Sequence, residues 1–482
     1  MIRNLILLAF YLAYSVSFSQ TVKKQTTIIE GKEPDYKGMT LRLLSFSDYI
    51  TKKEIELAAC KVDSLGNFRF SFSQEQSMQT FIKLGALKGI FYPEPGNTYF
   101  VKFPPRADKT KAEELNPFFT EDEFYIGCTN HSKDELTYNI GFFTQKYNEY
   151  LELKYLEIIK KGHHYDIEKD IRKFDSIFPT TKPFFKVYKN YRYAELRNLS
   201  TNRENSESLQ KQIVHKPIYT TNPAYMDFFN KVCYNYFLQL SKNSQDENIA
   251  IHIGMQASIS KLRNDIVLLE GNIGDTLTEM AIMKGIYDAF YEKSYPLKSL
   301  FSILDSMQNS TQLEMIREMS KNMKSKFTQM LEGFAAPNFE LPDKKDNLYD
   351  LASFKGKYVY LNFCTRESYT CLEHFELIKK IHSEMNNHLE VVSICIDENF
   401  EATLSLAQQM GYKWLFLNAS KNTTVIHDYL VKAYPTYFLI DPEGFLVFSP
   451  APSPIEDFGQ KYNQAVLERK ISQLRKNKDE KE

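Results

Sequence analysis

The spacing of hydrophobic positions divides the chain into three parts, and in the first part that spacing is two. Phe68, Phe70 and Phe72 alternate with polar residues, which is the pattern of a strand that buries one face. Stretches rich in Gly, Pro, Asn and Asp separate this strand from its neighbours and predict turns. We therefore predict a small antiparallel β-sandwich in residues 20–105. Its further strands are expected at 40–44, 54–60, 80–84 and 98–103.

In the second part, residues 106–331, the hydrophobic spacing becomes helical. Asn222 and Pro223 have the residue types preferred at an N-cap and at the first helical position. Thr276 and Glu279 have the spacing of a capping box, which predicts a helix that starts after Thr276. This part is therefore predicted to be an α-helical domain.

The helical part offers two patterns that resemble binding sites. Its helices carry stripes of Phe and Tyr, which we interpret as core packing, since a stripe at helical spacing normally faces other helices. His163 and His164 are adjacent and so point in different directions, which disfavours a metal pair. We expect the domain to be a spacer or a surface that recognises a partner, and the sequence leaves both possibilities open.

The third part, residues 332–482, combines short apolar runs with helical segments. Uninterrupted apolar runs are typical of strands that are covered on both faces of a sheet. The predicted order is strand, helix, strand, helix, and then a hairpin, which indicates an α/β domain. The runs and segments are a strand at 358–363, a helix at 368–386, a strand at 391–397, a helix at 400–410, a hairpin at 434–448 and a last helix from 456.

Composition and charge narrow the possible partners. The chain has 482 residues, 43% hydrophobic and 25% charged, which is too long for one core and ordinary for a globular protein. Its formal net charge is −1, so no overall field attracts a polyanion, and we expect no nucleic-acid partner.

Residues 1–19 have the pattern of a signal peptide. Arg3 precedes an apolar run at 5–16, and small residues stand at Ser17 and Ser19 just before Gln20. The run is too short to span a membrane and no stop-transfer segment follows it, so we expect no integral membrane segment after cleavage. We predict export to the periplasm of a Gram-negative-type bacterium, where disulfides can form.

The six cysteines are too sparse for a disulfide scaffold. Cys364 and Cys371 are close in sequence, seven positions apart. Cys233 and Cys395 lie among apolar residues and are predicted to be small buried hydrophobes. We predict no cofactor and no metal site.

Three groups of residues in the third part carry a resemblance to a known family. They are the domain entry Gly333-x-x-Ala336-Pro337-x-Phe339-x-Leu341-x-Asp343, the strand Leu361-Asn362-Phe363, and the loop and hairpin from Tyr434-Pro435-Thr436 to Gly444. They resemble exported thiol–disulfide oxidoreductases of the TlpA/ResA type, which have a thioredoxin-like fold and overlap with the AhpC/TSA–redoxin superfamily. The resemblance implies a cis peptide bond before Pro435. The β-sandwich, in turn, is similar to a β-domain of unknown function that often precedes such domains.

The active-site motif of that family is incomplete in this chain. The pattern Trp-x-x-Trp-Cys-x-x-Cys falls on Cys364, Glu367, Ser368 and Cys371, so both tryptophans and the attacking cysteine are replaced. A serine hydroxyl needs a base to become nucleophilic. We therefore predict that Ser368 caps the following helix. Cys364, Ser368, Cys371 and Pro435 remain the candidate redox-site positions.

Two interpretations of Cys371 stay open. It shares a helical face with Phe375 and Ile378, which favours a buried and inert thiol. It could instead form a disulfide with Cys364 if the two Cα atoms lie within bonding range. His374 could lower the pKa of the Cys371 thiol if it were charged, but we expect it at the surface or rim of the domain.

Two functions follow from these alternatives. The first is a degenerate family member that binds a protein or peptide partner, which could itself be a thiol or disulfide protein, without a full dithiol cycle. The second is an active thiol–disulfide oxidoreductase that uses Cys371 with Cys364, or Cys371 alone with a thiol partner. A peroxiredoxin-like activity is less favoured, because a cysteine is expected near Ser368 and the Pro-x-x-x-Thr motif lacks its proline before Thr365.

Overall fold

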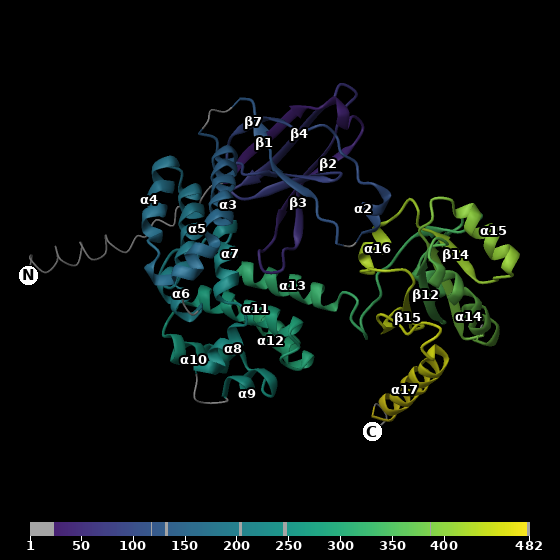
Figure 1. Cartoon of the computed structure of the whole chain (residues 1–482). Coiled ribbons are helices and arrows are strands. Elements are labelled where there is room, and N and C mark those ends of the chain that lie inside the picture. The colour runs from purple at the N-terminus through teal and green to yellow at the C-terminus, as the bar shows by residue number, and fades with distance from the viewer. Residues whose placement is uncertain are drawn as a thin grey trace, which may run out of the picture. The chain divides into compact units, whose positions relative to one another are not determined.

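A computed structural model describes residues 24–116, 118–130, 134–201, 205–243, 248–385 and 387–479 (Figure 1). The predicted signal peptide, residues 1–19, lies outside these residues. The structure divides into two compact units, the first made of Met1–Asp108 with Glu121–Ser320 and the second of Lys109–Thr120 with Lys321–Glu482. Its N-terminal sheets, helical middle region and C-terminal sheet confirm the predicted multidomain fold class.

The strands of the first unit form two sheets around an aromatic-rich core. They are β1 (Gln25–Lys32), β2 (Thr40–Phe46), β3 (Glu54–Lys61), β4 (Asn67–Gln74), β5 (Thr80–Leu84), β6 (Leu87–Phe91), β7 (Thr98–Lys102), β8 (Asp122–Tyr125) and β9 (Gly127–Cys128). The sheet orders are β4-β1-β7-β9 and β3-β2-β5-β6-β8. Phe68, Phe70 and Phe72 of β4 are buried between exposed neighbours, which confirms the predicted alternation. Most pairs are antiparallel, whereas β1–β7 and β6–β8 are parallel. A short 3₁₀ turn, η1 (Pro34–Tyr36), follows β1.

Helices make up the rest of the first unit and continue a few residues into the second. They are α3 (Leu136–Lys161), α4 (Ile167–Ile177), α5 (Pro183–Thr201), α6 (Asn205–Gln212), α7 (Pro223–Val232), α8 (Tyr236–Asn243), α9 (Asn248–Gly254), α10 (Ile259–Glu270), α11 (Asp275–Tyr291), α12 (Leu297–Ser310) and α13 (Glu314–Thr328), with η2 (Gly162–His164) after α3. The ring of Phe143 in α3 packs edge-on against Phe174, Phe178 and Phe185. These contacts confirm that the aromatic stripe serves core packing.

The two predicted helix starts had different outcomes. The Asn222 side chain accepts a hydrogen bond from the backbone N–H of Tyr225 at 3.4 Å, which confirms the N-cap of α7. The capping box at Thr276 and Glu279 is wrong, because α11 begins at Asp275 after Gly274. The carboxylate of Glu279 instead accepts hydrogen bonds from the Arg263 guanidinium and a threonine hydroxyl. Tertiary partners therefore use the side chain that the local pattern had assigned to the helix start.

The C-terminal sheet belongs to the second unit. Its elements are β12 (Tyr358–Cys364), α14 (Tyr369–Met385), β13 (Leu389–Cys395), α15 (Phe400–Met410), β14 (Leu415–Asn418), α16 (Thr424–Asp428), β15 (Thr436–Ile440), β16 (Leu446–Phe448) and α17 (Phe458–Asp479), preceded by β10 (Leu341–Pro342), β11 (Leu348–Tyr349) and η3 (Leu351–Phe354). The strand order is β14-β13-β12-β15-β16, with β12, β13 and β14 parallel and the β15–β16 hairpin antiparallel to them. This is the predicted α/β domain with a hairpin edge.

Strand β12 is central in that sheet, and each of its residues is buried. Its side chains alternate between two cores, one on each face of the sheet. Leu361 and Phe363 face the first core, whereas Tyr360 and Cys364 face the second, which also contains Cys371 of α14. The buried apolar run of β12 thus places the end of the strand inside the domain rather than at its surface.

A short segment far upstream in the sequence also belongs to the second unit. Helix α2 (Lys111–Leu115) starts with a capping box between Thr110 and Glu113, and the Lys111 ammonium group donates to the Ser420 carbonyl at 3.0 Å. The two compact units are divided by how residues pack. The domain boundaries predicted at residues 105 and 331 stay predictions. Among the described residues, no helix combines the length and apolar character that crossing a membrane requires.

Candidate functional site

The candidate site lies where β12 ends and α14 begins. Cys364 is the last residue of β12, a four-residue loop follows, and Tyr369 opens α14. Cys364 and Cys371 are each 1% exposed. The strand and helix predicted from the sequence are therefore present, but both cysteines face the core.

Ser368 occupies the N-cap position of α14. Its hydroxyl oxygen accepts a hydrogen bond from the Cys371 backbone N–H at 3.4 Å, as the predicted cap requires, and the hydroxyl donates to the Tyr434 carbonyl at 3.3 Å. The peptide bond between Tyr434 and Pro435 is cis, which confirms the implication of the resemblance. Neither of these two contacts supplies a base, so within the described structure Ser368 links the helix start to the cis-proline loop and is not activated as a nucleophile.

Cys371 is a protonated thiol at neutral pH. Burial raises the pKa of the Cys371 thiol to about 11, and the neighbouring Cys364 adds to the rise. Hydrogen bonds from the Thr365 backbone and from Ser368 lower this pKa, but only in part. Since the thiolate is the reactive form, Cys371 is poorly suited to attack a disulfide.

Cys364 contacts a cysteine that is distant in sequence. Its sulfur lies 3.6 Å from the sulfur of Cys395, and the two residues are directly paired in the register of β12 and β13. Burial raises the pKa of the Cys364 thiol well above its usual range, and Cys395 contributes to the rise. Cys395 is buried, as predicted, but no pattern in the sequence indicated this contact. All three cysteines are free thiols in the structure, so a bond between Cys364 and Cys371 stays a prediction.

A buried carboxylate organises the loop between β12 and α14. Asp397 follows β13, and its oxygens accept hydrogen bonds from the Thr365 hydroxyl at 2.7 Å and from the Arg366 backbone N–H at 3.1 Å. The Thr403 hydroxyl donates to the same carboxylate at 2.9 Å. Sequence reasoning placed Asp397 at the end of a strand and missed this role. The available signal was an acid at the carboxyl end of a strand next to the site.

His374 lies in the interior of the domain, 4% exposed. The expected position at the surface or rim was therefore wrong. Tyr437 of β15 covers the ring, and its hydroxyl lies 2.9 Å from Nδ1 of His374. Burial lowers the pKa of His374, so the imidazole is neutral at neutral pH and supplies no positive charge to stabilise a Cys371 thiolate.

Tyr434 is a further buried side chain near the thiols. Sequence reasoning assigned it no role of its own. Its hydroxyl is buried and has no hydrogen-bond partner within the described structure. Burial raises the pKa of Tyr434 to about 12, with smaller contributions from Cys364 and Cys371. The thiols thus lie among neutral aromatic side chains, and this environment disfavours every charged intermediate of thiol exchange.

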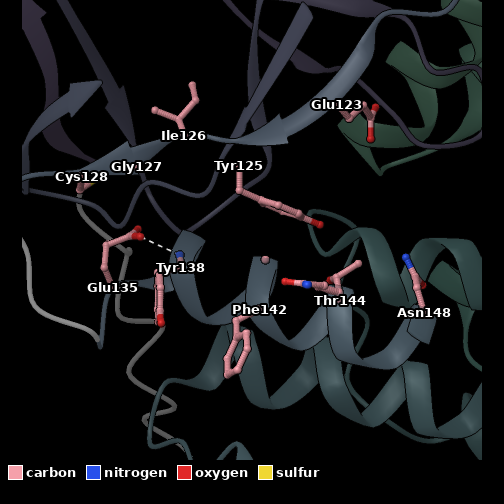
Figure 2. Close-up of a pocket in the computed structure, with 12 residues that line it drawn as sticks. Glu123, Tyr125, Ile126, Gly127, Cys128, Glu135, Tyr138, Phe142, Thr144 and Asn148 are labelled. Carbon is pink, nitrogen blue, oxygen red and sulfur yellow. Dashed lines mark hydrogen bonds between the residues drawn. The ribbon is translucent and has the colours of Figure 1, made fainter. Parts of the chain in front are cut away.

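A separate cavity of about 650 Å³ lies in the first unit, between β8–β9 and α3 (Figure 2). The ring of Tyr125 packs on α3 at Gly141, where a Cβ would lie 2.8 Å from a ring atom. Three polar side chains of the cavity are engaged within the fold. Glu135 caps α3, Glu123 pairs with a lysine of β6, and Thr144 shares a hydrogen bond with a tyrosine hydroxyl. We assign no ligand to this cavity.

Comparison with known proteins identifies relatives of the C-terminal domain. Residues 333–449 match the model of the AhpC/TSA family. The thiol–disulfide oxidoreductase ResA of Bacillus subtilis is 30% identical over 118 residues, which cover 24% of this chain and 65% of that protein. The ResA of Bacillus cereus strain ZK / E33L is 29% identical over 120 residues, which cover 25% of this chain and 69% of that protein.

Solved structures match the same part of the chain. The thioredoxin domain of a thiol–disulfide oxidoreductase from Bacteroides vulgatus is 20% identical, with a TM-score of 0.26, and the match covers 28% of this chain and 98% of that one. A thiol–disulfide oxidoreductase from Bacteroides fragilis is 22% identical, with a TM-score of 0.23, and the match covers 24% of this chain and 88% of that one.

Proposed function

We propose that this protein binds a protein or peptide partner without a full dithiol cycle, and the similarity of its C-terminal domain to thioredoxin-like thiol–disulfide oxidoreductases supports this. The observation that carries the proposal is the Ser368 hydroxyl. It stands at the position of the attacking thiol and is engaged with the helix start and the Tyr434 carbonyl. Cys371, the remaining cysteine of the motif, is buried and has a raised pKa.

The surface around Ser368 supports binding. Tyr369, the first residue of α14, is 79% exposed, and the neighbouring loop residues Arg366 and Glu367 are exposed as well. In the family, extended segments bind beside the cis-proline, and an exposed backbone edge suits that mode. Tyrosine is a frequent anchor in interfaces because it buries a large area at little conformational cost. We therefore propose Tyr369 as a contact residue for the partner.

An activity assay separates this proposal from the alternative, in which Cys371 acts with Cys364. The mature protein is mixed with a small disulfide substrate and a dithiol reductant, and turnover is compared with that of Cys371→Ala. Binding without redox chemistry predicts equal rates. A wild-type rate well above that of the variant would overturn the proposal and establish the oxidoreductase.

Photocrosslinking tests the binding surface directly. A photoreactive residue is introduced at Tyr369 or, as a matched control, at the exposed Lys355 in the same domain. In cells that produce the protein, position 369 is expected to form a discrete adduct that position 355 does not form. Identical adduct patterns from the two positions would remove Tyr369 from the interface.

We also propose that the protein works outside the cytoplasm. The charge and apolar pattern of residues 1–19 supports this location, since it has the features of a signal peptide. The measurement is the N-terminus of the protein recovered from cell fractions. A chain that starts at Gln20 in the periplasmic fraction is expected, and an uncleaved chain in the cytoplasm would contradict the proposal.

A further inference from the structure

Two cysteines that do not stand at the cysteine positions of the family motif meet at the carboxyl ends of neighbouring strands. Cys364 ends β12 and Cys395 ends β13, and the register pairs the two residues directly. Their sulfurs are 3.6 Å apart, and the side chains are 1% and 0% exposed. Since both side chains belong to the same core cluster, no other side chain has to move from between them.

This arrangement falls within reach of a disulfide. Neighbouring strands lie about 4.7–4.9 Å apart, inside the range of about 4.4–6.8 Å between the Cα atoms of bonded cysteines. The sulfurs, 3.6 Å apart, must approach by about 1.5 Å to reach bonding distance. Small changes in side-chain torsion and strand spacing at the two strand ends can provide that movement.

We propose that Cys364 and Cys395 are the disulfide-forming pair of this domain, oxidised by a low-molecular-weight disulfide while the chain folds. The thiolate of one cysteine attacks the small disulfide, whose S–S bond breaks and releases one thiolate. The thiolate of the other cysteine then attacks the protein sulfur of the mixed disulfide and releases the second. The two cysteines lose two electrons and two protons, and the small disulfide takes them up to become two thiols.

The timing follows from burial. In the folded domain the Cys364 and Cys395 sulfurs are buried and inaccessible to a small disulfide, and burial raises the pKa of the Cys364 thiol, which disfavours the thiolate that exchange requires. In the unfolded chain both thiols are exposed to solvent and accessible to a small disulfide. The bond therefore forms before the sheet closes over the sulfurs, and the folded protein then retains whichever state it acquired.

The consequence for the candidate site is twofold. The bond joins the ends of the strands that carry the Asp397 contacts to Thr365 and Arg366, so it stiffens the loop that presents Ser368. It also removes Cys364 as a partner for Cys371. This inference goes beyond the proposed function, since the bond can form whether or not Tyr369 contacts a partner, and the two are tested by separate measurements.

Tryptic mapping of the wild-type protein provides the test. Cleavage after Lys357, Arg366, Lys379, Lys380 and Lys413 places the three cysteines in separate peptides, 358–366, 367–379 and 381–413. The full-length protein is unfolded, reduced, refolded in a buffer of reduced and oxidised glutathione, alkylated and digested. The expected product joins 358–366 to 381–413. A link from 358–366 to 367–379 would overturn the proposal. Alkylation of all three thiols would also overturn it, because it would show that Cys364 and Cys395 are two inert thiols in contact only.

Variants and unfolding curves add a second readout. The oxidised wild-type protein is expected to unfold at a higher urea concentration than protein refolded with reductant, because the bond restricts the unfolded chain. Cys371→Ala should keep this difference, and Cys395→Ala should abolish it. If Cys395→Ala does not fold, the wild-type peptide map still decides the pairing. A difference that disappears in Cys371→Ala would assign the bond to Cys371 and overturn the proposal.

Discussion

Two neighbouring regions of the C-terminal domain differ in the side chains that they offer for thiol chemistry. At the helix start, Ser368 to Cys371, a serine hydroxyl caps α14 and Cys371 lies in the core. At the strand ends, Cys364 and Cys395 bring two thiols into contact in the core. The helix start has a hydroxyl next to exposed residues, and the strand ends have two thiols without access to solvent. The difference shows that thiol chemistry depends on accessibility and local charge as much as on the presence of cysteine.

Restoring the thiol at the helix start should have the largest effect. Ser368→Cys places a sulfur at the N-terminus of α14, where backbone N–H groups favour the thiolate, and Cys371 follows three residues later. We expect turnover of a small disulfide to rise by about tenfold or more over the wild-type background. The same variant with Cys371→Ala is the control and should lose the gain. A folded Ser368→Cys variant without turnover would show that the binding groove has diverged too.

Removing the carboxylate behind the strand ends should destabilise the domain. Asp397→Ala leaves the Thr365 and Thr403 hydroxyls and the Arg366 backbone N–H without their acceptor. We expect a loss of about 2–4 kcal/mol in the free energy of unfolding, measured with urea. The adjacent, exposed Glu398 offers the matched control, and Glu398→Ala should change stability by less than about 0.5 kcal/mol. Equal effects would mean that the carboxylate does not organise the loop.

Removing the cap at the helix start should cost less. Ser368→Ala deletes the bond to the Cys371 backbone N–H and the donor to the Tyr434 carbonyl. The loss of a serine N-cap costs about 1 kcal/mol of unfolding free energy. The control is Thr370→Ala, at an exposed position two residues further along the chain. It should leave the free energy of unfolding nearly unchanged. A neutral Ser368→Ala would contradict the structural role given to the hydroxyl.

The buried histidine should make the free energy of unfolding decrease as the pH falls below neutral. Burial lowers the pKa of His374 in the folded protein. As pH falls below about 6.5, this histidine therefore takes up a proton more readily in the unfolded chain than in the folded protein, and the free energy of unfolding decreases. His374→Gln should lose less unfolding free energy than wild type between about pH 7.5 and pH 5.5. His388→Gln, at an exposed position, should follow wild type. Parallel pH profiles for wild type and His374→Gln would place the titration elsewhere.

Local patterns predicted those parts of the site that depend on neighbouring residues. The apolar run of β12, the start of α14 and the N-cap at Ser368 each depend on residues a few positions apart, and each is present in the structure. The position of His374 was predicted wrongly, because the helix pattern does not show that Tyr437 of a distant hairpin covers it. The error came from a tertiary contact.

The order of elements in the C-terminal domain and the absence of a cysteine at position 368 could both be inferred without the fold. Hydrophobic spacing and residue identity are local properties, so they can be read without the fold. The contact between Cys364 and Cys395, in contrast, became evident from the three-dimensional fold alone. The parallel register of β12 and β13 sets that pairing, and a shift by two residues would leave the same buried pattern while separating the sulfurs. Register depends on the packing of the whole sheet. The hydrophobic pattern of either strand alone therefore could not predict which residues are paired.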